Sequence, residues 1–360
     1  MSETRESSDT PEGPARRDSS GPQPGADATG AVRNGTGAGA AEGGPHRVFD
    51  AATLAARRRR ALALGPEPFL LERLADDLAD RLSAVNRHFA LAADIGTPSG
   101  ELRRALAGHP AIGRLIALGP AERADIDAVM EAEALPLAPG SLDLAVSALA
   151  LQAVNDLPGL LAQIRRALKP DGLLLAALFG AGTLAELREA FAIAESETTG
   201  GISPRVAPFA DLRDLGGLLQ RAGLALPVTD IDRVVVRYAD PLALFADLRR
   251  MGATNPLADR LRTPLRRATL TRLFEVYSER FADADGRVRA TFEIAWISGW
   301  APHESQQQPL RPGSAKARLA DALTATERRL PFEPGCGGAV TGTCAGAGRR
   351  LSPGRGREGR

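Results

Sequence analysis

Cysteine, lysine and aromatic residues are all scarce in this chain of 360 residues. Its two cysteines, Cys336 and Cys344, lie in a glycine-rich stretch near the C-terminus, which excludes a disulfide framework and a cysteine-based structural zinc site. Lysine occurs only at Lys169 and Lys316, so arginine carries almost all of the positive charge. Because aromatic residues make up only 4% of the chain, the core must consist mainly of alanine, leucine and valine.

The chain has neither an excess of charge of one sign nor a long apolar run. The 45 basic and 44 acidic residues leave a formal net charge of +1, so no global field attracts nucleic acid or an anionic membrane. No apolar run approaches the ~18 residues of a membrane span. We therefore expect proteins or small molecules as partners, and neither nucleic acid nor a membrane.

Both ends of the chain have low sequence complexity. Residues 1–45 and 324–360 lack apolar periodicity, which predicts disordered tails because such segments bury too little surface to offset the entropy of ordering. The first tail has no apolar stretch typical of a secretory signal, and its acidic residues are unlike a mitochondrial presequence. We therefore expect a cytoplasmic location.

Residues 46–323 predict one α/β domain. Residues 46–88 have helical periodicity and predict a helical cap, whereas in 89–180 short apolar runs alternate with helices, as in a parallel sheet. Residues 181–323 predict an insertion followed by the last two strands. The expected strands are 89–93, 114–118, 127–131, 142–147, 173–179, 233–238 and 291–300, which gives a Rossmann-like seven-stranded sheet.

A glycine-containing turn follows the first strand, in the pattern Asp94-x-Gly96-x-x-x-Gly100. Glycines at this place allow backbone amides to approach a ligand, and the helix N-terminus that follows favours electron-rich groups. With the turn at 169–172 before the fifth strand, this pattern resembles the class I S-adenosylmethionine-dependent methyltransferases. The resemblance implies that Asp94, Gly96 and Gly100 hold the methionine end of S-adenosylmethionine.

The same resemblance implies contacts to the rest of the cofactor. An acidic residue after the third strand reads the adenine amino group in that family, and Glu131 and Glu133 match this position; solvated loop charge is the alternative. Pro98 stands in place of the usual central glycine of the first loop, and it offers no N–H. Gly119 stands where the family has an acid that binds the ribose. We therefore predict a cofactor site that is degraded at these two positions.

Longer motifs resemble the methyltransferase-like assembly factors of respiratory complex I, with the malonyl-carrier-protein methyltransferases as more distant relatives. These motifs are 149–158, 163–172, 200–205, 213–216, 219–223 and 299–316. Ala153 departs from the pattern, which usually has a bulky aromatic residue there. The resemblance implies a role in early assembly of complex I, where one member hydroxylates an arginine of a peripheral-arm subunit.

Four residues are candidates for substrate binding. Asn155 and Asp156 follow the fourth strand, on the edge where open α/β sheets present substrates, although Asp156 could instead cap the helix that begins at Leu157. Arg205 and His303 lie in family-like segments, with a solvated loop and a structural role as their alternatives. The four histidines show no paired ligand spacing, so we expect no metal site. No catalytic residue stands out, because methyl transfer asks mainly for alignment of donor and acceptor.

Three functions follow from these observations. The leading hypothesis is an S-adenosylmethionine-dependent, methyltransferase-like enzyme that hydroxylates or methylates a protein during complex I assembly, with a peripheral-arm subunit as a possible partner. The first alternative is methylation of a small or carrier-bound acid. The second is a non-catalytic assembly chaperone on a decayed methyltransferase scaffold.

Overall fold

The computed structural model describes residues 47–120, 123–131 and 133–307. The predicted tails lie outside these residues, and so does the end of the predicted domain from 308 to 323. Within the described part of the chain, no helix has the length and apolar character that a membrane crossing requires.

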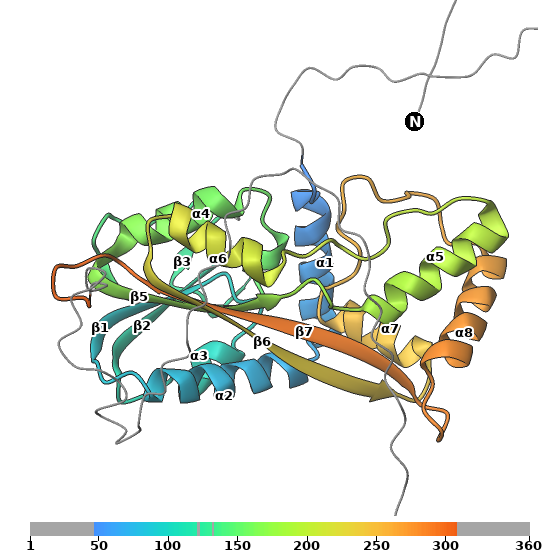
Figure 1. The fold of residues 1–360 in the computed structure, drawn as a ribbon, viewed down its shortest axis with the longest axis horizontal. Helices are drawn as coiled ribbons and strands as arrows, with labels where there is room; N and C mark the ends of the chain where they lie inside the picture. Colours follow the sequence, from blue (N-terminus) through green and yellow to red (C-terminus); the bar gives the residue numbers. More distant parts are fainter. Residues whose placement is uncertain (1–46, 121–122, 132, 308–360) are drawn as a thin grey trace, which may run out of the picture.

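A seven-stranded mixed sheet forms the centre of the fold, in the order β3-β2-β1-β4-β5-β7-β6 (Figure 1). Strands β1 to β5 run parallel, and β7 lies antiparallel between β5 and β6. This is the Rossmann-like α/β arrangement that the sequence predicts. The strands are β1 (Phe89–Ile95), β2 (Ile112–Gly119), β3 (Ala128–Val129), β4 (Leu142–Ala148), β5 (Leu168–Phe179), β6 (Ala225–Tyr238) and β7 (Val288–Trp300).

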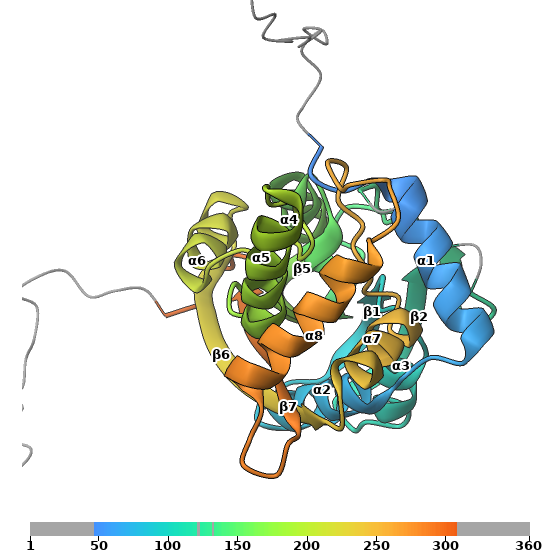
Figure 2. The same ribbon diagram turned by 90° about the vertical axis from the view of Figure 1, so that its right-hand side faces the viewer.

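Helices cover both faces of the sheet. One face carries α2 (Phe69–Ser83) and α3 (Glu101–Ala105), and the other carries α4 (Leu157–Ala167) and α6 (Leu212–Arg221). Around the far ends of β6 and β7 lie α5 (Ala185–Thr199), α7 (Pro241–Arg250) and α8 (Arg267–Phe281), with α5 and α8 side by side (Figure 2). The first helix, α1 (Ala51–Leu64), packs against α7 and forms the predicted cap together with α2.

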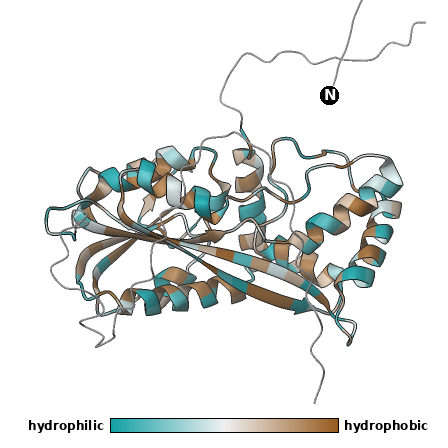
Figure 3. Cartoon of the chain, viewed as in Figure 1, coloured by the Kyte–Doolittle hydropathy of each residue, from teal (hydrophilic) through white to brown (hydrophobic). Residues whose placement is uncertain are grey.

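The central strand β5 is buried on both faces. Every residue from Leu173 to Phe179 is buried, because helices cover a parallel sheet on both sides. Figure 3 shows apolar residues along these central strands. The sequence predicts this strand well, since a continuous apolar run after a Pro-Asp-Gly turn has few other interpretations.

The last two strands differ from the prediction in extent and position. β6 is longer than the predicted 233–238, because it pairs with β7 from Ala225 to Tyr238. Asp230 and Asp232 disfavour a strand by composition, and here they form ion pairs of 2.8 and 3.0 Å with Arg81 and Arg73 of α2. β7 is antiparallel to both of its neighbours and lies inside the sheet, and β6 forms the edge. The helices α5 and α6 precede both strands, and α7 and α8 join β6 to β7.

Helix α1 is held against the turn that follows α7 by a close approach at Gly252. This residue has a φ of 69°, and a Cβ atom on it would lie 3.3 Å from the Arg58 Cα and 3.5 Å from the Ala61 Cβ. A positive φ favours glycine, and a Cβ here would be in tight contact with the backbone of α1. Gly252 therefore sets the position of α1 over the rest of the fold.

We expect the substitution Gly252→Ala to reduce the free energy of unfolding by about 1–3 kcal/mol, because it combines backbone strain with a clash against α1. Urea unfolding of the full chain measures the loss. Gly286→Ala is the matched control, since Gly286 has a φ of 80° and open space around its Cβ position. Equal losses in the two variants would contradict the role of the contact with α1.

Candidate active site

The loop after β1 is built around the buried carboxylate of Asp94. The Thr97 hydroxyl donates to Asp94 Oδ1 at 2.5 Å and accepts from the Ala148 amide at 3.1 Å, which joins the ends of β1 and β4. Ser147 Oγ donates to the Ile95 carbonyl at 2.7 Å and strengthens the same junction. The loop that the sequence predicts for the cofactor therefore lies at the carboxyl edge of the sheet, where open α/β folds bind ligands.

This loop fits the methionine end of S-adenosylmethionine. Asp94 Oδ2 is buried and has no hydrogen-bond partner among the described residues, although buried polar atoms are almost always paired. An ammonium group is the kind of donor that such an oxygen needs. Gly96 has a φ of 72° and turns the chain beside Ala150, and Gly100 precedes α3, so the glycines lie where the motif places them.

Burial raises the pKa of Asp94 from 3.8 to about 6, because desolvation outweighs the Thr97 hydrogen bond and the Arg123 charge. The folded state thus holds this proton more tightly than the unfolded state between those pH values, and stability falls as the pH rises from about 4 to about 6.

We therefore expect Asp94→Asn to be nearly neutral at about pH 4 and to stabilise the chain by about 3 kcal/mol at about pH 7. Urea unfolding of both proteins across this range measures the difference. Asp50→Asn is the contrasting control: Thr53 and Arg260 hydrogen bonds hold the pKa of Asp50 well below its usual range, so this variant should lose stability at neutral pH. A stability difference at Asp94 that does not change with pH would contradict the account.

Arg123 lies over the same loop. Its side chain is buried and donates to the Thr97 carbonyl, and it binds Asp125 through two hydrogen bonds, of 2.8 Å from Nε and 2.5 Å from Nη2. Asp125 Oδ2 in turn lies 2.8 Å from the position of a Cβ on Gly100. The segment after β2, where the family has its ribose-binding acid, thus covers the first loop with an arginine–aspartate pair.

Sequence reasoning missed Arg123 and Asp125. The signal was the connection between β2 and β3, which is too short for a helix and which carries an arginine two residues before an aspartate. Such a pair can bury an arginine, because the carboxylate neutralises it locally.

The predicted adenine-reading acids follow β3 and are both exposed. The Glu133 carboxylate accepts from the Asn155 amide at 3.0 Å, and its backbone carbonyl accepts from Gln163 at 2.8 Å. Glu131 forms a backbone bridge with Ala134. Their contact with adenine stays a prediction.

Asn155 and Asp156 have clear structural partners after β4. Asn155 Oδ1 accepts from the Phe49 amide at 2.8 Å, and its Nδ2 donates to the Phe49 carbonyl at 3.2 Å, so this residue fixes the entry to α1. Asp156 caps α4, as one interpretation of the sequence predicts, with Oδ1 accepting from the Gly159 amide at 2.8 Å.

Arg205 is held by Glu195 of α5. Arg205 donates to Glu195 Oε1 from Nε at 2.7 Å, and its Nη2 lies 2.5 Å from the same oxygen. The Ser203 amide and hydroxyl also donate to this carboxylate. The family-like segment 200–205 therefore folds around one buried acid.

His303 does not lie with the other candidates. It is exposed after β7, beside the start of β5, where its Nδ1 lies 2.7 Å from Ser305 Oγ. Nearby, Asp171 pairs with Arg87 and accepts from Gln306 at 3.0 Å. These contacts give the family-like segment around 299–307 a structural role at the amino edge of the parallel strands.

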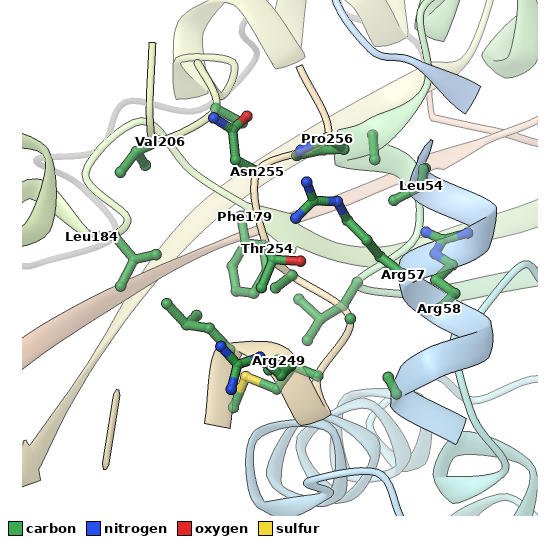
Figure 4. A pocket seen from close by; sticks show the side chains of 18 of the residues that line it. Leu54, Arg57, Arg58, Phe179, Leu184, Val206, Arg249, Thr254, Asn255 and Pro256 are labelled. Atoms are coloured by element: carbon green, nitrogen blue, oxygen red, sulfur yellow. The ribbon is translucent and has the colours of Figure 1, made fainter. Parts of the chain in front are cut away.

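A cavity of about 530 Å³ opens next to the first loop. Pro98, Ser99 and Ala153 belong to its lining. Figure 4 shows residues of α1 and of the segment after α7 around it. Phe179 and Phe292 contribute to an apolar lining, and Arg205 also faces the cavity. Within the described residues, no group of three histidine, cysteine or acidic side chains could hold a metal ion.

Comparison with known proteins agrees with this architecture. The methyltransferase domain family matches residues 93–176, which run from β1 to β5. The mitochondrial arginine-hydroxylase NDUFAF5 of Homo sapiens is 37% identical over 288 residues, covering 76% of this chain and 83% of the relative. The malonyl-[acyl-carrier protein] O-methyltransferase of Laribacter hongkongensis is 37% identical over 216 residues, covering 60% of this chain and 65% of the relative.

Among solved structures, the YcgJ protein of Bacillus subtilis is similar with a TM-score of 0.44 at 14% identity, covering 63% of this chain and 98% of that protein. The human relative aligns over most of both chains, and its sequence identity of 37% is high for an alignment of that length. The chain therefore belongs to the NDUFAF5 arginine-hydroxylase family, which has the methyltransferase fold.

Proposed function

We propose that this chain modifies an arginine side chain of a protein during assembly of respiratory complex I, with a peripheral-arm subunit as its substrate. The observation that carries the proposal is the cavity, which reaches Pro98 and Ser99 of the first loop in a chain of the arginine-hydroxylase family. A side chain that enters this cavity from the outer walls would meet the loop at the edge of the sheet.

S-adenosylmethionine is the cofactor that we propose for the loop. When bound, it supplies a sulfonium group that activates the attached carbons. The Asp94 carboxylate would hold the ammonium of its methionine end, and Thr97 fixes this carboxylate through the hydrogen bond described above. The apolar walls around Phe179 and Phe292 would exclude water from the reacting side chain.

A second candidate function is a non-catalytic assembly factor. The position of Arg123 over the first loop favours it, because the chain's own ion pair takes up space beside Gly100 and Gly119. In this case the fold would serve assembly by binding its partner alone. For either function we propose a cytoplasmic location.

Deletion of the gene in the source organism tests the process and separates the two candidates. We expect native gels to show incomplete complex I in the deletion strain and full assembly after return of the wild-type chain. Asp94→Asn should fail to restore assembly if the cofactor is required, and it should restore assembly if the protein acts as a scaffold. Normal complex I in the deletion strain would contradict both.

A further inference from the structure

Most of the charged residues that line the cavity beside the first loop are positive. Six arginines line it, and Glu67 is its one acidic lining residue among those described. Three of these arginines are neutralised: Arg250 by Glu67 at 2.6 Å, Arg260 by Asp50 at 3.0 Å and Arg205 by Glu195 at 2.5 Å. The other three are Arg57, Arg58 and Arg249.

The guanidinium groups of these three arginines form no ion pair or hydrogen bond with any described residue. Figure 4 shows them on two walls, Arg57 and Arg58 on α1 and Arg249 at the end of α7. Burial lowers the pKa of Arg58, and burial together with the Arg260 and Arg60 charges lowers that of Arg57. Arg57 and Arg58 are half-buried, whereas Arg249 is exposed. A cation that loses water without gaining a partner destabilises the protein, and an anion between these walls would remove that penalty for Arg57 and Arg58.

The rest of the lining is apolar. Leu54, Leu70, Phe179, Leu184 and Val206 face the same cavity, and its volume lies within the range of sites for small organic ligands. A free inorganic ion would leave these walls without a partner. The occupant should therefore combine an anionic group with an apolar body.

We propose that this cavity binds an organic anion, with its carboxylate or phosphate on Arg57, Arg58 and Arg249 and its apolar body between α1, β5 and the 205–209 segment. The inference rests on the proposed function and specifies its substrate. A lone arginine would be repelled by three unpaired guanidinium groups, so the modified residue must enter together with an acidic group.

Calorimetric titration of the full chain with decanoate and decyl phosphate tests the proposal without any turnover. We expect both anions to bind, 1-decanol to bind at least about tenfold more weakly, and decyltrimethylammonium not to bind, because only the anions pair with guanidinium groups. Binding of the anions should weaken between about 0.05 M and about 0.5 M KCl in the wild-type chain, a result that needs no variant.

The double variant Arg57→Gln/Arg249→Gln should bind decanoate at least about tenfold more weakly, with unchanged circular dichroism. Arg166→Gln is the matched control, since Arg166 is exposed on α4 and does not line the cavity. Equal affinity for decanoate and 1-decanol, no effect of the double variant, or no binding of either anion would each overturn the proposal.

Competition with peptides identifies the source of the anion. The peptide acetyl-Leu-Leu-Glu-Arg-Leu-amide is compared with the same peptide in which glutamine replaces glutamate. If only the glutamate peptide displaces decanoate, the anion belongs to an acidic residue of the protein substrate. Displacement by neither peptide assigns it to a free organic acid. Because these are binding measurements, absence of arginine modification would contradict the proposed function without contradicting the anion site.

Discussion

The variant Arg123→Ala is expected to bind S-adenosylmethionine at least about tenfold more tightly than the wild-type chain. If the cofactor occupies the first loop as proposed, in the wild type it would displace a buried guanidinium that donates to the Thr97 carbonyl and to Asp125. Hydrogen bonds that involve charged groups contribute about 1.5–3 kcal/mol each, and about 1.4 kcal/mol corresponds to a tenfold change in affinity. Calorimetric titration of both proteins at one salt concentration measures the change.

Arg103→Ala is the control for this experiment. Arg103 belongs to the same neighbourhood. It is half-buried, pairs with Asp127 at 2.9 Å and donates to the Asp125 carbonyl at 2.7 Å, but unlike Arg123 it forms no hydrogen bond with Thr97. Its removal should leave the affinity for the cofactor unchanged. An affinity of Arg123→Ala that equals the wild-type value, or falls below it, would show that Arg123 does not compete with the cofactor.

Replacement of Glu195 by alanine is expected to reduce the free energy of unfolding by about 3–5 kcal/mol, because it leaves the guanidinium of Arg205 partly buried and unpaired. The side chains of Glu195 and Arg205 are 4% and 15% exposed, so solvent compensates little of this loss. The Ser203 amide and hydroxyl would lose their acceptor as well. Urea unfolding measures the effect.

The control for Glu195 lies on the same helix. Glu197 pairs with Arg272 at 2.5 Å but is 49% exposed, so Glu197→Ala should change stability little. A similar small loss in Glu195→Ala would contradict the structural role of the buried pair.

The pH dependence of this pair follows from its partners. Burial, the largest influence, raises the pKa of Glu195, but hydrogen bonds from Ser203 and Arg205 together lower it below its usual value of 4.5. The pair therefore stabilises the fold at neutral pH, and this stabilisation is lost as the pH falls through the lowered pKa.

The sequence predicts well those parts of the fold that depend on local pattern. The apolar run of β5 and the cap of α4 by Asp156 need only neighbouring residues, and the structure has both. Asp94, Gly96 and Gly100 lie together at the end of β1 because a strand–turn–helix motif fixes them locally.

The sequence pattern does not predict those parts of the fold that depend on partners distant in the chain. The early residues of β6 pair with the distant strand β7, the acids among them pair with arginines of α2, and Asn155 binds the backbone of Phe49. Arg123 is buried only because Asp125 and the Thr97 carbonyl surround it. The cavity joins α1 to the segment after α7, and no periodicity along the chain indicates that these two meet.

Peptide mass spectrometry of the complex I peripheral arm tests the central claim most directly, with the deletion strain compared to strains that carry the wild-type or the Asp94→Asn chain. Our account predicts that one arginine-containing peptide in the deletion strain lacks a mass that the wild-type chain restores and that Asp94→Asn does not. A missing oxygen mass identifies hydroxylation, which needs an oxidant from outside the chain, and a missing methylene mass identifies methylation. Identical peptide masses in all three strains would contradict it.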